Sequence, residues 1–224
     1  MAKKVFLSAG HGGIDSGAVG NGLKEKDINL QTLLACKSEL ERHGVVVVCS
    51  RTKDEIDTVT QEVTEANSSG AEIAVSFHAN AGGGDGFEAF YFSSNAKGKK
   101  LAELGEKYVK ALGQNSRGLK SGNHLYFIKR TTMPSVLFES FFVDNAKDKT
   151  IGDTVAEQQK FGVAYAKAIL EYLGITYKEV STSTPQTSSD KLYRVVVGSY
   201  KNKANADAML QKLKKAGFDG FITC

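Results

Sequence analysis

The strongest constraint on the fold is the alternation of short apolar runs with longer helical segments. Residues 45–49 (VVVVC) and 71–77 (AEIAVSF) have the length of strands, whereas residues 27–43 repeat their leucines at helical spacing. Gly44 follows this helix in the usual position of a C-terminal cap. Strands that alternate with helices are typical of parallel sheets with helices on both faces. We therefore predict an α/β fold with a mostly parallel central sheet flanked by helices.

The same pattern extends over residues 1–178, which we predict to form one domain. The continuous β-branched run at 45–49 predicts a strand that is buried on both faces. Further strands are expected at 4–8, 86–92, 125–129 and 135–141. Further helices are expected at 57–69, 96–112 and 154–173.

The C-terminal part of the chain has a different composition. Residues 179–190 (EVSTSTPQTSSD) have almost nothing to bury and predict a linker. Residues 191–224 predict a small β-α-β unit, with strands at 192–197 and 218–222 around a helix at 203–216. This unit carries a net charge of +5 in a chain of net charge +4, which favours contact with an anionic surface. A solvated lysine-rich helix face is the alternative interpretation of these charges.

Composition excludes several classes of protein. No apolar run approaches the roughly 20 residues that cross a membrane, and the run at 5–7 is too short for the core of a signal peptide. We expect synthesis in the cytoplasm without an export signal, and neither a membrane nor a nucleic acid as partner. The three cysteines form no Cys-x-x-Cys pair, so neither a disulfide framework nor a cysteine zinc site is indicated.

Four chemically capable side chains lie near the ends of predicted strands, where open α/β sheets bind ligands. His11 follows the first strand, His78 ends the strand that begins at 71, Glu25 precedes the first long helix, and Glu139 lies in an apolar strand. Each has a simpler explanation taken alone. A single histidine often caps a turn, and an acid in the first turn of a helix complements its dipole. Glu139 is the hardest to explain structurally, because a carboxylate among apolar neighbours should not be buried unpaired.

Together, these four residues fit a catalytic zinc site. Two imidazoles and one carboxylate hold a catalytic zinc ion while a fourth position stays open to water. A second carboxylate then serves as general base. On this interpretation His11, Glu25 and His78 bind one Zn²⁺, and Glu139 is the base.

The surrounding motifs resemble a known family. They are Gly-His-Gly-Gly-x-Asp-x-Gly-Ala at 10–18, Glu-Lys-Asp-x-Asn-Leu at 25–30, Ser-x-His-Ala-Asn at 76–80 and Met-Pro-x-Val-Leu-x-Glu at 133–139. Over roughly residues 3–175 the chain resembles the zinc-dependent N-acetylmuramoyl-L-alanine amidases (type 3 catalytic domain) of phage endolysins and spore-forming bacteria. This resemblance implies the same zinc ligands, with Glu139 as the catalytic carboxylate and Asn80 as a substrate contact.

The chain departs from the family pattern at two places. Ser8-Ala9 stands where the family usually has Asp-Pro, which changes the groups that support His11. Lys129 or Arg130 stands near the position where the family often has an arginine, and only an arginine offers the planar fork that suits a carboxylate. We count both among the expected substrate-binding residues.

The tail also resembles a known module. Residues 193–202 (YRVVVGSYKN) with the helix that follows are similar to the first half of a sporulation-related (SPOR) repeat, which implies binding to glycan strands. The exposed sheet edges of a half-module tend to recruit a partner, so a homodimer through two tails is one hypothesis, and a disordered relic is the other.

The resemblance implies hydrolysis of the peptidoglycan amide bond between N-acetylmuramic acid and the L-alanine of the stem peptide. Without an export signal, such an enzyme reaches the wall after membrane failure or lysis of a mother cell. A zinc peptidase that cuts within the stem peptide, and a non-catalytic wall-binding protein, are the alternatives. A glycosidase would need paired carboxylates without a metal.

Overall fold

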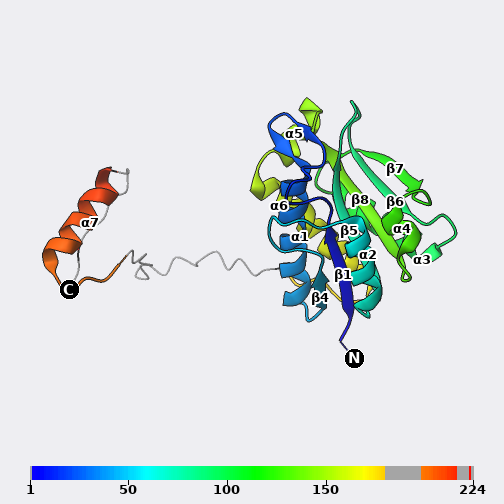
Figure 1. Ribbon diagram of the computed structural model, residues 1–224, viewed down its shortest axis with the longest axis horizontal. Coiled ribbons are helices and arrows are strands. Elements are labelled where there is room, and N and C mark those ends of the chain that lie inside the picture. Colours follow the sequence, from blue (N-terminus) through cyan, green and yellow to red (C-terminus); the bar gives the residue numbers. More distant parts are fainter. Residues whose placement is uncertain (1, 180–197, 216–221, 223–224) are drawn as a thin grey trace. The chain divides into compact units, whose positions relative to one another are not determined.

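The computed structural model describes residues 2–179, 198–215 and 222 of the chain. The chain forms two compact units, Met1–Glu179 and Val180–Cys224 (Figure 1). The first unit contains the sheet and all of the residues expected in the active site. The predicted linker at 179–190, apart from its first residue, and the predicted strand at 192–197 lie outside the described residues.

A six-stranded sheet forms the centre of the first unit, in the order β4-β1-β5-β8-β6-β7. Neighbouring strands are parallel except for β8 and β6, which are antiparallel. The prediction of a mostly parallel sheet is therefore confirmed. The strands are β1 (Lys4–Ala9), β4 (Val46–Cys49), β5 (Ile73–Asn80), β6 (Phe87–Tyr91), β7 (Ser116–Ser121) and β8 (Ser135–Phe142). A separate two-stranded sheet pairs β2 (Val19–Gly20) with β3 (Leu23–Lys24).

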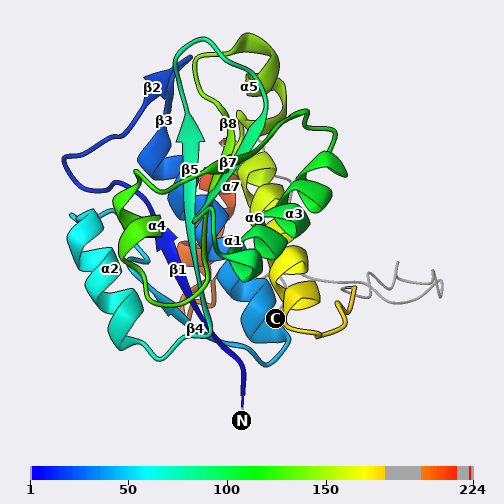
Figure 2. The ribbon, with the colours of Figure 1, turned by 90° about the vertical axis from the view of Figure 1, so that its right-hand side faces the viewer.

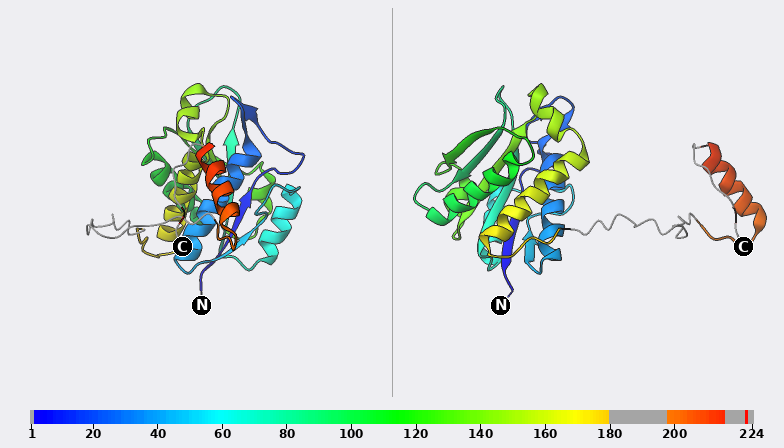
Figure 3. Two further views of the ribbon diagram at one scale, coloured as in Figure 1. Left: turned by 90° about the vertical axis from the view of Figure 1, so that its left-hand side faces the viewer. Right: turned by 180° about the vertical axis from the view of Figure 1, so that it is seen from behind.

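Helices cover both faces of the sheet, as Figure 2 shows. One face packs against α1 (Glu25–Arg42), α3 (Ala96–Lys110) and α6 (Val155–Tyr172), and α6 lies between the other two (Figure 3). The opposite face packs against α2 (Val59–Ser68) and the short α4 (Tyr126–Arg130). The remaining helix of this unit, α5 (Ala146–Gly152), follows β8.

Two of these helices begin with a capping box that the sequence encodes directly. The Thr58 hydroxyl accepts from the backbone N–H of Gln61 at the start of α2, and Thr154 does the same with Glu157 at the start of α6. In both cases the N3 side-chain oxygen in turn accepts a hydrogen bond from the backbone N–H of the cap residue. Because these bonds satisfy otherwise unpaired donors, they fix where the helices begin.

One predicted strand is wrong. Residues 125–129 were expected to be a strand, but Tyr126–Arg130 forms helix α4. Phe127 and Ile128 are consecutive and both pack in the same apolar cluster, which a helical turn allows and a strand, with its alternating faces, does not. The sheet position is filled instead by β7, an edge strand whose polar sequence (SRGLKS) gave no apolar pattern.

The expectation that residues 45–49 are buried on both faces is also wrong. Strand β4 lies at the edge of the sheet, where it pairs with β1 alone. The side chain of Val46 is 44% exposed. A β-branched run therefore favours a strand here without placing it in the middle of the sheet.

In the second unit, the described residues include helix α7 (Lys203–Lys215), which confirms the predicted helix at 203–216 to within one residue. Lys203 pairs with Asp207 one turn later. The predicted strand at 218–222 lies almost wholly outside the described residues. Among the helices of the described segments, none is long and apolar enough to cross a membrane.

Candidate active site

The four predicted catalytic residues lie together near the carboxyl ends of strands β1, β5 and β8. His11 lies on the loop after β1, and Glu25 is the first residue of α1. His78 in β5 and Glu139 in β8 are direct partners in the register of these neighbouring strands. Side chains at paired positions point to the same face, so the strand register itself brings these two residues together.

His11, Glu25 and His78 form a compact cluster. Each offers one ligand atom, and these atoms lie within 4.8 Å of one another. His11 Nε2 is 3.2 Å from Glu25 Oε2, and His78 Nδ1 is 2.8 Å from Glu25 Oε1. The two imidazole rings meet edge to face at 5.2 Å between centroids. The carboxylate thus lies between the two rings, with one oxygen directed to each.

Two glycines make room for this cluster. A Cβ at Gly10 would lie 2.3 Å from His78 Nε2, and a Cβ at Gly17 would lie 2.5 Å from Glu25 Oε2. His11 itself has a φ of 67°, a conformation that few residues with a Cβ adopt. The glycines of the first motif are therefore needed for close approach to the ligands as well as for turning the chain.

Neighbouring groups orient the side chains of His11 and Glu25. Asp15 Oδ2 lies 2.8 Å from His11 Nδ1, which leaves Nε2 directed toward Glu25. The backbone N–H groups of Ala18 and Ala79 donate to the two oxygens of Glu25. A carboxylate on the far nitrogen of a histidine fixes its tautomer and is typical of metal-binding histidines.

The end of β1 is held without the Asp-Pro of the family pattern. Ser8 is fully buried and its Oγ accepts a long hydrogen bond of 3.4 Å from Ser76 Oγ. The buried guanidinium of Arg51 donates to the carbonyl of Ala9 at 2.8 Å, and Asn29 Nδ2 donates to the carbonyl of Gly10 at 2.9 Å. These bonds anchor the backbone immediately before His11 without a carboxylate at position 8.

The cluster attracts positive charge strongly. Burial opposes the ionised form of Glu25, but hydrogen bonds from His11 and His78 outweigh it and hold the pKa of this carboxyl far below its usual range. The hydrogen bond to Glu25 raises the pKa of His11 to about 9, and despite burial the pKa of His78 is also raised.

Glu139 lies beside this cluster in a different environment. Its Oε2 is buried and has no hydrogen-bond partner among the described residues. Burial raises the pKa of Glu139 to about 7, with the nearby charges of Glu25 and Glu88 acting in the same direction and His78 opposing them. A carboxyl with a pKa near neutrality can both accept and donate a proton at physiological pH.

Asn80 lies at the end of β5, beyond His78. Its side-chain amide donates to Glu88 Oε2 at 3.2 Å. Glu88 is buried, and it is the register partner of Glu139 on β6. Arg117 and Lys120, both on β7, donate to the other oxygen of Glu88. The sequence analysis did not predict a role for Glu88, Arg117 or Lys120. Glu88 lies between Phe87 and Ala89, and this alternation indicates a polar side chain on the opposite face of the strand.

Lys129 and Arg130 lie on α4, and both are exposed. The guanidinium of Arg130 lies over the ring of Tyr126, and its carbonyl accepts from Asn67 Nδ2 on α2. No hydrogen bond or ion pair links either residue to the zinc-ligand cluster within the described segments. Their assignment to the substrate site stays a prediction.

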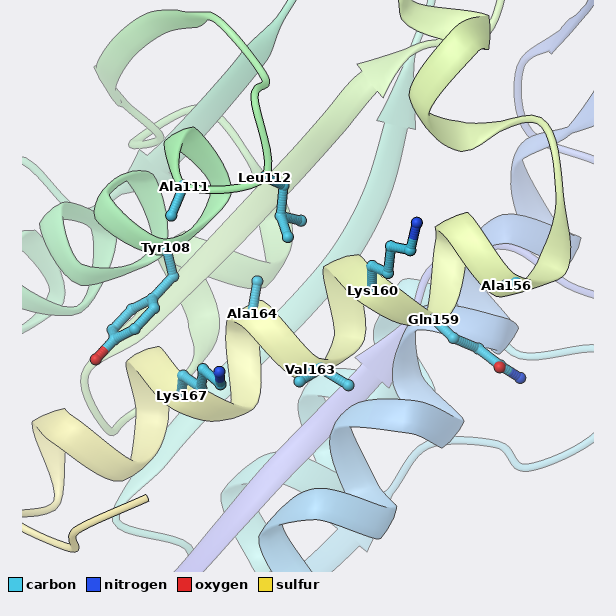
Figure 4. A pocket seen from close by; sticks show the side chains of 9 residues that line it. All are labelled: Tyr108, Ala111, Leu112, Ala156, Gln159, Lys160, Val163, Ala164 and Lys167. Atoms are coloured by element: carbon cyan, nitrogen blue, oxygen red, sulfur yellow. The ribbon is translucent and has the colours of Figure 1, made fainter. Parts of the chain in front are cut away.

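A separate groove lies on the outer side of the helical layer (Figure 4). It has a volume of about 520 Å³ and lies between α3 and α6. Its lining includes Leu112, Val163 and Lys167. The side chains that line it include neither a histidine nor a carboxylate, so this groove lacks the groups predicted for the active site.

The chain is similar to known proteins. Residues 5–171 match the family model described as N-acetylmuramoyl-L-alanine amidase. The chain belongs to this amidase family. Within the amidase domain, the match spans all four residues of the site.

Individual relatives extend the comparison to most of the chain. The N-acetylmuramoyl-L-alanine amidase CwlM of Bacillus licheniformis is 33% identical over 223 residues, which cover 98% of this chain and 84% of that protein. An endolysin of Bacillus phage SPP1 is 33% identical over 231 residues, with coverage of 98% and 83%. The catalytic domain of the amidase CwlV from Bacillus (Paenibacillus) polymyxa var. colistinus is 35% identical with a TM-score of 0.72, covering 78% of this chain and 99% of that structure.

The C-terminal resemblance is also found. Residues 162–223 match the SPOR domain model, a match that begins inside α6 of the amidase domain and runs through α7. The resemblances to the amidase family and to the SPOR module are thus both confirmed.

Proposed function

We propose that the chain hydrolyses the amide bond between N-acetylmuramic acid and L-alanine in peptidoglycan, using one zinc ion and Glu139 as general base. The family membership supports the reaction. The observation that carries the zinc assignment is the convergence of His11, Glu25 and His78.

The chemistry of the donor set fits zinc. Two imidazole nitrogens and one carboxylate are a ligand set that catalytic zinc sites use, with a fourth position open. The lowered pKa of Glu25 and the raised pKa values of both histidines indicate a site whose charge balance favours a cation. Asp15 on the far nitrogen of His11 completes the pattern. A zinc ion held there would lower the pKa of water and polarise the substrate carbonyl.

Glu139 has the properties required for the proton transfers. Its carboxylate accepts a proton from the attacking water as the new carbon–oxygen bond forms. The amide C–N bond then breaks, and Glu139 returns this proton to the departing nitrogen of L-alanine. The products are the carboxylic acid of the muramic acid and the free amine of the stem peptide, so a single carboxyl, that of Glu139, serves both steps.

Digestion of purified peptidoglycan tests this proposal. After treatment with the full chain and zinc, new amines are labelled and the labelled residues are identified. Labelled L-alanine alone is the expected result. Other labelled residues would show a peptidase, new reducing ends a glycosidase, and an undigested wall that retains the protein a binding module. The Glu139→Gln variant, which keeps all three zinc ligands, is the matched control.

The second unit fits a role in holding the enzyme on its substrate. We propose that the SPOR-like tail binds glycan strands and that two tails pair to complete one module. The match of residues 162–223 to the SPOR model supports the first part. Analytical ultracentrifugation of the full chain against a truncation after Glu179 tests the second, because a monomer in both cases would exclude pairing through the tail.

The route to the wall is the remaining part of the proposal. The similarity to a phage endolysin and to sporulation amidases supports release by membrane failure or by lysis of a mother cell. Expression in a host with and without a membrane-permeabilising agent tests it. Lysis only after permeabilisation is expected, and lysis without it would show that the chain crosses the membrane unaided.

A further inference from the structure

A pair of cations lies on the same face of the sheet as the catalytic residues. Arg117 Nε and Lys120 Nζ both donate to a single oxygen of Glu88, at 2.6 and 2.5 Å. Glu88 is buried, with only 4% of its surface exposed. The other oxygen of Glu88 accepts from Asn80. Glu88 therefore has both oxygens engaged and holds two cationic side chains close together.

Register and hydrogen bonds together connect this pair to the predicted catalytic residues. His78, Glu139 and Glu88 are successive register partners across β5, β8 and β6. The register shifts where β6 pairs with β7, and Lys120 is there the partner of Phe90. The hydrogen bonds of Arg117 and Lys120 to Glu88 therefore place the two cations at the end of this row.

The charges of this group are not balanced by its own buried carboxylate. One carboxylate neutralises one cation, and two cations on the same oxygen repel each other. Two further acids lie near Arg117. Asp85 is 44% exposed with an oxygen 3.9 Å from Arg117 Nη1, and Asp148 is buried with its Oδ2 already accepting from the backbone N–H groups of Gly86 and Phe142. Both cationic side chains also remain accessible, Arg117 at 41% and Lys120 at 38%. The arrangement offers an accessible, preorganised place for a further anion.

Two aromatic rings restrict where these cations point. The guanidinium of Arg117 lies 5.3 Å above the ring of Phe142, and Lys120 Nζ lies 5.9 Å from the ring of Phe90. Contacts of this kind hold a long side chain in place, so less conformational entropy is lost when a ligand binds.

We propose that Arg117 and Lys120, held by Glu88, bind the α-carboxylate of the second residue of the stem peptide. In peptidoglycan the residue after L-alanine is a glutamate linked through its side chain, so its α-carboxylate is either free or amidated. Arginine suits this role because its guanidinium binds a carboxylate through two parallel hydrogen bonds. This inference rests on the proposed amidase function and names the substrate group that Arg117 and Lys120 recognise.

The distances agree with this assignment. From the scissile nitrogen to the second α-carboxylate the peptide spans about two residues, roughly 7 Å when extended. From Glu139, which must contact the scissile bond, to strand β7 is two strand spacings, roughly 10 Å. An ion pair of about 3 Å closes the difference. Carboxylates further along the stem peptide would extend beyond the edge strand.

A pair of substrates tests the proposal. Two disaccharide tripeptides are prepared that differ only in this group, one with the free α-carboxylate and one with the amide. For the full chain with zinc, kcat/KM is expected to be about 10- to 100-fold higher for the free acid, the range for hydrogen bonds to charged groups. Equal values for the two substrates would overturn the proposal, whereas cleavage of neither would refute the amidase function itself.

Variants assign the preference to these residues. Arg117→Gln and Lys120→Gln are each expected to lower the ratio of the two kcat/KM values about tenfold, and Arg117→Lys should retain part of it. Each single variant leaves Glu88 with one cation, and a thermal melt confirms folding. Lys99→Gln, which removes a cation from the exposed face of α3, is the matched control and should leave the ratio unchanged. A merely structural ion pair would lower both values equally, and that result would also overturn the proposal.

Discussion

Replacing Glu139 by glutamine separates its chemical role from its cost to stability. The substitution keeps the size and shape of the side chain and removes only its charge. In the metal-free protein the pKa of Glu139 is raised from 4.5 to about 7, chiefly by burial. The ionised form is therefore destabilised by about 3 kcal/mol relative to the unfolded chain, at 1.36 kcal/mol per pKa unit.

The sign of the pH dependence follows from this shift. A carboxyl whose pKa is raised on folding is neutral in both states below about 4.5, and no stability is lost there. As the pH rises toward 7, the unfolded chain ionises freely while the folded protein keeps its proton, so stability falls and then levels off. Glutamine cannot ionise. The variant should match the wild type near pH 4 and exceed its stability by about 3 kcal/mol at pH 8.

Urea unfolding of both proteins in the presence of a chelator, at pH values from 4 to 8, measures this difference. His11, Glu25 and His78 are present in both proteins, so the measured difference reports Glu139 together with its charge interactions with these residues. A difference that does not change with pH, or a variant less stable than the wild type at pH 8, would refute the burial of an unpaired carboxylate. With zinc restored, the variant should bind the metal normally and lose about 10²- to 10⁴-fold in kcat.

The ligand cluster gives three further expectations. Gly17→Ala should weaken zinc binding and destabilise the fold by about 1–3 kcal/mol, because its Cβ would lie 2.5 Å from Glu25 Oε2. The control is Gly22→Ala, which has a similar positive φ but open space around the new Cβ and should cost only the backbone strain. Zinc titrations and melts of the two variants compare them; equal losses would exclude the steric explanation. Asp15→Asn should lower zinc affinity or activity about 10- to 100-fold. Chelator competition measures the affinity. Unchanged affinity and activity would show that Asp15 does not support His11. Zinc affinity should rise with pH up to about 9, because the metal must displace the proton from His11. The same competition assay at pH 6, 7 and 8 measures this rise. An affinity that does not change with pH would contradict the expectation.

That His11, Glu25, His78 and Glu139 lie close together was predictable because each stands in a distinctive local sequence. The motif around His11 combines glycines with a polar residue directly after an apolar strand, and Glu139 is an acid in an apolar run. The order of elements also follows from the sequence, because parallel strands require helical crossovers. These features depend on local pattern and on one general rule of topology.

The group formed by Glu88, Arg117 and Lys120 was not predictable in this way. Strand β7 is short, polar and at the sheet edge, so it lacks the apolar alternation that identifies a strand. The contact of Arg117 and Lys120 with Glu88 depends on the pairing of β7 with β6. The helix α4 was missed because its apolar residues are too few to show a period. Register and pairing between distant segments are set by tertiary packing, which local sequence does not record.

Anomalous diffraction at the zinc edge, from crystals grown with zinc, tests the metal site most directly. We expect one peak in the amidase domain, about 2.0–2.2 Å from a nitrogen of His11, a nitrogen of His78 and an oxygen of Glu25, with Glu139 beside it but outside the ligand set. Density at another place, or these three side chains turned apart with no peak between them, would contradict the zinc-dependent mechanism.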